Sequence, residues 1–133
     1  MAKSDKPKTK SIPSEHWKDE PDDHDYPAAG DYLSLLMEDD EVQAAIKSLH
    51  DAPITHRKAK DLLRASRLGL LSPENPHVAS ALEKVRRGDR LSPILVVRGK
   101  ADQDIPLTVA DGYHRICASY HIDENADIPC RIA

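Results

Sequence analysis

The segment PLTVADGYHR at residues 106–115 constrains the fold of this chain more than any other. Strand-forming residues run up to Asp111, and a helical pattern begins directly after Gly112. This junction predicts a strand that turns at once into a helix, with Tyr113, His114 and Arg115 on the first helical turn. The first N–H groups of a helix have no internal partners and carry partial positive charge, so such a turn is suited to bind an anion.

The residue types at this turn strengthen the hypothesis of a phosphate or carboxylate site. Gly112 has no side chain and therefore lets another group approach the backbone closely. His114 and Arg115 add side-chain hydrogen-bond donors. The structural alternative is that His114 and Arg115 simply form an exposed helix face with a salt bridge.

The length of 133 residues fits one domain, and the absence of Phe leaves Leu, Ile, Val and Ala to build the core. No apolar run is long enough to span a bilayer, and the N-terminus lacks the apolar middle of a signal peptide. We therefore expect a cytoplasmic protein without membrane contact. Cys117 and Cys130 lack a CxxC neighbour and are expected to be reduced, structural thiols.

Charge is distributed unevenly along the chain. Eleven acidic residues and one basic residue, Lys18, lie between Glu15 and Glu41, whereas ten Lys or Arg and four acidic residues lie between Arg57 and Arg98. This pattern fits an anionic ligand or a nucleic acid on one face, or a solvated basic surface that an acidic strap partly neutralises. The net charge of −4 argues against a dedicated duplex-DNA binder.

The front of the chain is predicted to be helical. Residues 1–25 are interpreted as a disordered tail or a strap, which Trp17 could anchor on the domain. Helices are expected over 27–37, from the N-cap Asp39 to residue 49, from the N-cap Thr55 to Ser66, and from Pro76 to Gly88.

The back of the chain predicts a small sheet. Strands are expected over 94–98, 107–110 and 128–132, with a helix over 112–121 between the last two. Pro129 suggests an edge or end position for the final strand. We therefore expect an α+β fold with a small mixed sheet, as a single domain over 26–133 with a helical front at 26–70 and a core at 71–133.

In this order the elements resemble the ParB/sulfiredoxin-like superfamily. Members often carry a P-I-x-V strand, then D-G-H-H-R, G-E-x-R or G-C-H-R at a helix start, and then a closing V-P strand. The matching segments here are PILVV at 93–97, DGYHR at 111–115 and IPCRI at 128–132, and the resemblance covers about residues 71–133.

The resemblance implies a nucleotide site, for ATP or ADP with magnesium, at the start of the helix. Gly112, His114 and Arg115 would hold the phosphates, and Tyr113 would stack on a base or merely pack. Asp111 matches the acid of the free-serine-kinase-like members and could cap the helix, orient Arg115 or help to hold magnesium.

Departures from the family patterns narrow the function. Tyr113 stands where sulfiredoxins have their nucleophilic cysteine, and no helix-turn-helix segment follows residues 128–132, so neither sulfiredoxin chemistry nor chromosome partition is expected. Three hypotheses remain: a small-molecule phosphotransferase, a non-catalytic nucleotide-binding module, and a DNA-associated nuclease-type protein. For the phosphotransferase, Glu74 is the candidate base. The alternative is that Glu74 is an ordinary solvent-facing acid in a loop.

Accessory residues are predicted around the site. His77 is expected to line the pocket, and Lys60 or Arg64 to face it across the sheet edge. The basic helix that carries these two residues is otherwise a solvated amphipathic surface. No third ligand accompanies His114 and His121, so no zinc site is expected.

Overall fold

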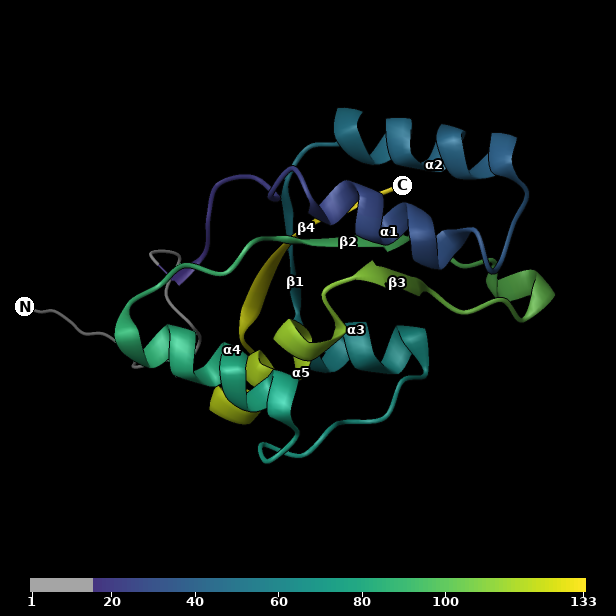
Figure 1. Cartoon of the computed structure of the whole chain (residues 1–133). Helices are drawn as coiled ribbons and strands as arrows, with labels where there is room; N and C mark the ends of the chain where they lie inside the picture. The colour runs from purple at the N-terminus through teal and green to yellow at the C-terminus, as the bar shows by residue number, and fades with distance from the viewer. Residues whose placement is uncertain (1–15) are drawn as a thin grey trace, which may run out of the picture.

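The computed structural model describes residues 16–133, in which a four-stranded mixed sheet separates two groups of helices (Figure 1). The strand order is β1-β4-β2-β3. β4 is antiparallel to β1 and parallel to β2, and β2 is antiparallel to β3. The strands are β1 (Thr55–Lys58), β2 (Ile94–Val97), β3 (Thr108–Asp111) and β4 (Asp127–Ile132). The predicted α+β fold with a small mixed sheet is confirmed.

Helices cover both faces of the sheet because β2 is apolar on both sides. Ile94 and Val96 face one core and Leu95 faces the other, as the two-residue period of a strand requires. The first core lies under α3 (Ala59–Ser66), α4 (Pro76–Arg87) and α5 (Tyr113–Ile122), and the second lies under α1 (Asp25–Leu33) and α2 (Asp39–Asp51).

Local signals define the ends of α4. Pro76 occupies the first turn, and the Asn75 side chain accepts hydrogen bonds from the backbone N–H groups of His77 and Val78. Gly88 ends the helix with a φ of 84°. The predicted start and end of this helix are confirmed.

The boundaries of the first two helices need correction. α1 begins at Asp25 and ends at Leu33, earlier at both ends than the predicted 27–37. In α2 the N-cap is Glu38 rather than Asp39, because Glu38 and Glu41 form a reciprocal capping box.

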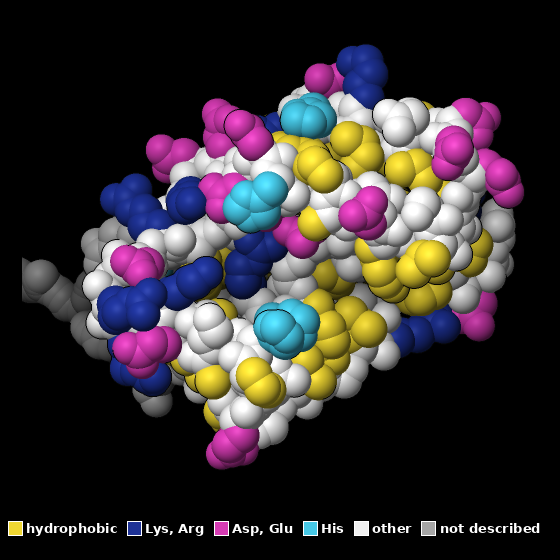
Figure 2. Space-filling view, in the orientation of Figure 1, with side chains coloured by type: hydrophobic (Ala, Val, Ile, Leu, Met, Phe, Trp, Pro, Cys, Tyr) yellow, Lys and Arg dark blue, Asp and Glu magenta, His cyan; other side chains and the backbone are white. Residues whose placement is uncertain are grey.

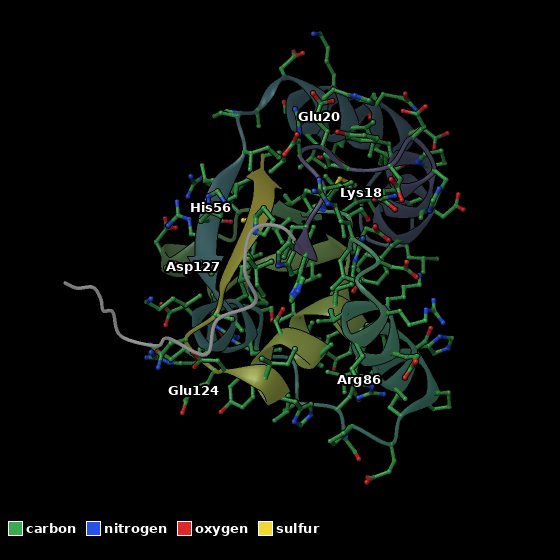
Figure 3. All side chains as sticks on the ribbon, turned by 90° about the vertical axis from the view of Figure 1, so that its left-hand side faces the viewer. Lys18, Glu20, His56, Arg86, Glu124 and Asp127 are labelled. Carbon is green, nitrogen blue, oxygen red and sulfur yellow. The ribbon has the colours of Figure 1, made fainter. Side chains whose placement is uncertain are left out.

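The predicted start of the third helix is wrong. Thr55 does not cap a helix but begins β1, which pairs with the edge of β4 that β2 leaves free (Figure 3 labels His56 on β1). The helix α3 starts only at Ala59. For Pro129 the sequence left an edge or an end position open, and the structure excludes the edge, because β4 lies between β1 and β2. Pro129 is tolerated there because the ladder with β2 begins at Cys130, so Pro129 stands at the end of that ladder.

Residues 16–24, which we call the strap, lie against the domain ahead of α1. Trp17 is 3% exposed and forms a parallel bridge with Leu91. The backbone N–H of Lys18 donates to the Leu91 carbonyl, and that of Leu91 donates to the His16 carbonyl, each at 2.8 Å. Trp17 therefore anchors the strap. The remainder of the predicted tail, residues 1–15, lies outside the described residues.

The cysteines and the lengths of the helices can also be compared with the predictions from the sequence. Cys117 and Cys130 are both buried and free, as expected for structural thiols. Among residues 16–133, no helix combines the length and apolar character that crossing a membrane requires.

Candidate functional site

The tip of α5 is shaped by Gly112, which is its N-cap and has a φ of 117°. A Cβ at this position would lie 2.4 Å from Cγ2 of Ile94 and 2.9 Å from Nη2 of Arg115. The glycine is therefore required both for its backbone conformation and for close packing. The Ile94 side chain fills the space that a side chain at position 112 would occupy. Asp111 makes no cap hydrogen bond to the helix.

Asp111 instead orients Arg115, one of the three roles that its position allowed. Nη2 of Arg115 donates to Oδ2 of Asp111 at 2.7 Å. Nη1 donates to the Ser92 carbonyl at 2.9 Å and also to the Ser92 hydroxyl. The same nitrogen lies 3.7 Å from Oδ2 of Asp25, whose side chain is 5% exposed. The guanidinium of Arg115 is thus already surrounded by protein acceptors.

The surroundings of Asp111 alter the charge state of its carboxyl group. Burial raises the pKa of Asp111, and the nearby Asp25 raises it further, whereas the Arg115 guanidinium opposes both effects. The cluster is therefore held together by Arg115, which is 16% exposed. Its contacts give Arg115 a role in the fold as well as any role in binding.

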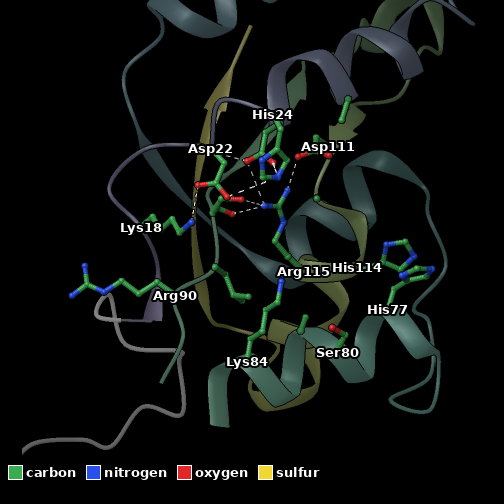
Figure 4. Close-up of a pocket in the computed structure, with 16 residues that line it drawn as sticks. Lys18, Asp22, His24, His77, Ser80, Lys84, Arg90, Asp111, His114 and Arg115 are labelled. Atoms are coloured by element: carbon green, nitrogen blue, oxygen red, sulfur yellow. Dashed lines mark hydrogen bonds and ion pairs between the residues drawn. The ribbon is translucent and has the colours of Figure 1, made fainter. Parts of the chain in front are cut away.

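A cleft of about 410 Å³ opens beside this cluster, between the strap, α4 and the start of α5 (Figure 4). Of the predicted site residues, it gathers five, namely His77, Asp111, Gly112, His114 and Arg115. The space-filling view shows the hollow with basic side chains along it and histidines on its opposite rims (Figure 2). The polar lining residues that the sequence did not point to are Lys18, Asp22, His24, Asp25, Ser80, Lys84, Arg90 and Ser92.

The other predicted site residues do not line this cleft. The Tyr113 hydroxyl donates to the Gly69 carbonyl, so its ring is turned toward the loop before α4. Glu74 is exposed in that loop, where its carboxylate accepts from the Ser72 hydroxyl. Lys60 and Arg64 line a second pocket on α3 instead of facing the cleft.

Two imidazoles lie together at one end of the cleft. The ring centroids of His77, from α4, and His114, from α5, are 4.7 Å apart, with the rings tilted by 45°. Burial lowers the pKa of His114, and the neighbouring His77 and Arg115 lower it further. The neutral form of His114 is therefore favoured, and a neutral imidazole can stack or accept a proton.

The strap brings a third group to the rim. One ligand atom each from Asp22, His24 and Asp25 lie within 4.8 Å of one another, and these are donor types that a divalent cation accepts. Cationic side chains already neutralise both carboxylates, because Lys18 Nζ lies 2.7 Å from Asp22 and Arg115 lies 3.7 Å from Asp25. The Lys18 hydrogen bond also lowers the pKa of Asp22.

Lys84 and Arg90 differ from the other cations of the cleft. Both are exposed and both line it (Figure 4). Among residues 16–133, no carboxylate lies within ion-pair distance of either side chain. A ligand can therefore bind these two charges without displacing an ion-pair partner from the segment 16–133.

Comparisons of this chain with protein-family models, with curated proteins and with solved structures give no significant match. The assignment of function therefore depends on the geometry of the cleft and on the resemblance of its motif.

Proposed function

We propose that this protein binds a phosphorylated small molecule, and specifically a nucleotide such as ATP or ADP with magnesium, in the cleft beside the tip of α5. The observation that carries the proposal is the cleft of about 410 Å³ in which two cations without an ion-pair partner among residues 16–133, Lys84 and Arg90, lie on the same surface as the paired imidazoles. Cationic side chains and ring faces are the groups that recognise phosphates and bases.

The order of elements supports the ParB/sulfiredoxin-like interpretation. β3 and α5 lie in sequence between β2 and β4, and these two strands pair in parallel. The D-G-Y-H-R segment falls at the junction of β3 and α5, where the family places its motif. We further propose the cytosol as the compartment, which the two buried free thiols support.

Within this proposal, a non-catalytic binding module is favoured over an enzyme. Every carboxylate that lines the cleft is ion-paired: Asp22 with Lys18, and Asp25 and Asp111 with Arg115. Glu74, the base expected for phosphoryl transfer, does not line it. The observation in favour of a phosphotransferase is His114, since a neutral imidazole in the cleft could take the proton of an acceptor.

A thermal-shift panel tests the binding proposal. ATP, ADP, AMP and inorganic phosphate are added at millimolar concentration, with and without magnesium. A ligand that binds only the folded state raises the melting temperature in a concentration-dependent way. The proposal fails if none of these compounds raises it. For any nucleotide that does, ³¹P NMR over hours in the presence of a panel of small-molecule alcohols as phosphoryl acceptors decides between the two roles, because an enzyme transfers the phosphoryl group to an acceptor and a module leaves the nucleotide intact.

A further inference from the structure

We infer that Lys84 and Arg90, rather than Arg115, hold the phosphates of the ligand, while the His77–His114 pair contacts its ring. This inference depends on the proposed function and deepens it, because it names the residues that determine specificity and the orientation of the ligand. The ligand class is a phosphate ester of a compound with a flat aromatic ring, of which a nucleotide is the standard example.

The first argument is that acceptors of the protein already engage the guanidinium of Arg115. Both of its terminal nitrogens already donate to Ser92 and Asp111, and Asp25 lies beside them. A phosphate that took over this guanidinium would leave the buried Asp25 carboxylate with only the exposed His24 ring, whose Nε2 lies at 3.4 Å, as a neighbour that can carry positive charge. An uncompensated buried charge is strongly unfavourable, so this route is disfavoured.

The second argument is that a ligand bound to Lys84 and Arg90 displaces no ion-pair partner that belongs to the described part of the chain. Both line the cleft, and no described carboxylate lies within ion-pair distance of either side chain. Lys84 stands on the face of α4 that also presents Ser80 to the cleft. Arg90 follows the end of α4, and the two therefore contribute charge from different segments. Charge-assisted hydrogen bonds from two cations suit a phosphate group.

The third argument is the spacing along α4. His77, Ser80, Ala81 and Lys84 all line the cleft, at the i, i+3, i+4 and i+7 positions of one helical face. At a rise of 1.5 Å per residue, His77 and Lys84 are about 10 Å apart along the helix axis. This separation leaves room for a ring beside the imidazoles and a phosphate beside Lys84. Figure 4 shows His77 and His114 together, with Arg90 on the other side of the cleft.

Three probes and four variants of the full chain separate the two ends of the cleft. ADP carries both groups, pyrophosphate carries only phosphate, and adenosine carries only the ring. Their affinities are measured by calorimetry, and for weak binders by ligand-observed NMR, on Lys84→Gln, Arg90→Gln, His77→Ala and the control Arg86→Gln. The control variant Arg86→Gln removes one positive charge from α4, as Lys84→Gln does. Arg86, which Figure 3 labels, pairs with Glu83 and does not line the cleft.

We expect Lys84→Gln and Arg90→Gln each to weaken ADP and pyrophosphate about tenfold, the loss of one charged hydrogen bond, and to leave adenosine unchanged. His77→Ala is expected to weaken ADP and adenosine and to leave pyrophosphate unchanged. Arg86→Gln changes none of the three affinities.

The outcomes distinguish this inference from the proposed function. If the unmodified protein binds ADP or pyrophosphate and both Lys84→Gln and Arg90→Gln bind equally well, the phosphate assignment is overturned while the binding function stands. If His77→Ala weakens pyrophosphate as much as ADP, the assignment of the ring is overturned. If the unmodified protein binds none of the phosphorylated compounds of the thermal-shift panel, the proposed function fails as well.

Discussion

Nη1 of Arg115 lies 3.7 Å from Oδ2 of Asp25, and this ion pair joins the start of α1 to the first turn of α5. Asp25 directly follows the strap, and its carboxylate also accepts from the backbone N–H of Asp22 at 3.0 Å. The pair therefore positions the strap, with Lys18 and His24, on the rim of the cleft. The same arginine that the sequence assigns to the ligand thus holds one wall of the cleft in place.

Replacing Arg115 by Ala should destabilise the fold by about 3–5 kcal/mol, because the buried carboxylate of Asp25 loses its guanidinium partner and keeps only the exposed ring of His24, with Nε2 at 3.4 Å, beside it. Urea denaturation monitored by circular dichroism measures the change. The control is Arg86→Ala, which removes an exposed pair with Glu83 and should change the free energy of unfolding little. An Arg115→Ala variant as stable as the unmodified protein would show that the ion pair has no structural role.

The anchor of the strap gives a second prediction. Trp17 is 3% exposed, so Trp17→Ala should cost about 3–5 kcal/mol of unfolding free energy. Among the described residues, its indole Nε1 has no hydrogen-bond partner. Trp17→Phe therefore keeps most of the packing and should cost clearly less. Thermal unfolding of both variants is compared with that of Leu35→Ala, whose side chain is 80% exposed. Equal effects of the Ala and Phe variants would contradict a packing role.

The sequence predicts those parts of the fold that local chemistry determines. Pro76 and Gly88 mark the ends of α4 because proline fixes a helical φ and glycine accepts the left-handed conformation after the last turn. The β3–α5 junction at Gly112 is visible for the same reason. β1 is not predictable in this way, because Thr55–Lys58 has no apolar alternation and becomes a strand only by pairing with β4.

The site is predicted only in part because half of the cleft comes from distant segments. His114 and Arg115 stand in a recognisable motif, and His77 lies near the start of a predicted helix. Lys18 and His24 reach the cleft only because Trp17 packs the strap against Leu91, a contact between distant parts of the chain. The uneven distribution of charge, acidic between residues 15 and 41 and basic between 57 and 98, was the sequence feature that indicated contact between an acidic front segment and a basic surface.

The packing of Gly112 against Ile94 gives a third prediction. Gly112→Ala combines a φ of 117° with a Cβ placed 2.4 Å from Ile94 Cγ2, and Ile94 is fully buried. The strained backbone alone should cost about 1–3 kcal/mol, and the contact adds to it. Gly69→Ala is the matched control, since no atom lies within 4 Å of its added Cβ, and it should be close to neutral. Differential scanning calorimetry of the two variants checks this, and equal melting temperatures would refute the packing argument.

The lowered pKa of His114 predicts how stability depends on pH. Burial, His77 and Arg115 all favour the neutral ring in the folded protein, so the pKa lies below its usual value of 6.5. The unfolded chain then binds the proton more tightly than the fold does. The contribution of neutral His114 to the free energy of unfolding is therefore fully present above pH 6.5, and it is lost as the pH falls through the folded-state pKa.

Denaturation between pH 5 and 8 tests this linkage with two histidine variants. His114→Gln should flatten the fall of stability on the acid side, whereas His56→Gln, at an exposed position on β1, should not. An unchanged acid limb in His114→Gln would assign the pH dependence to other groups.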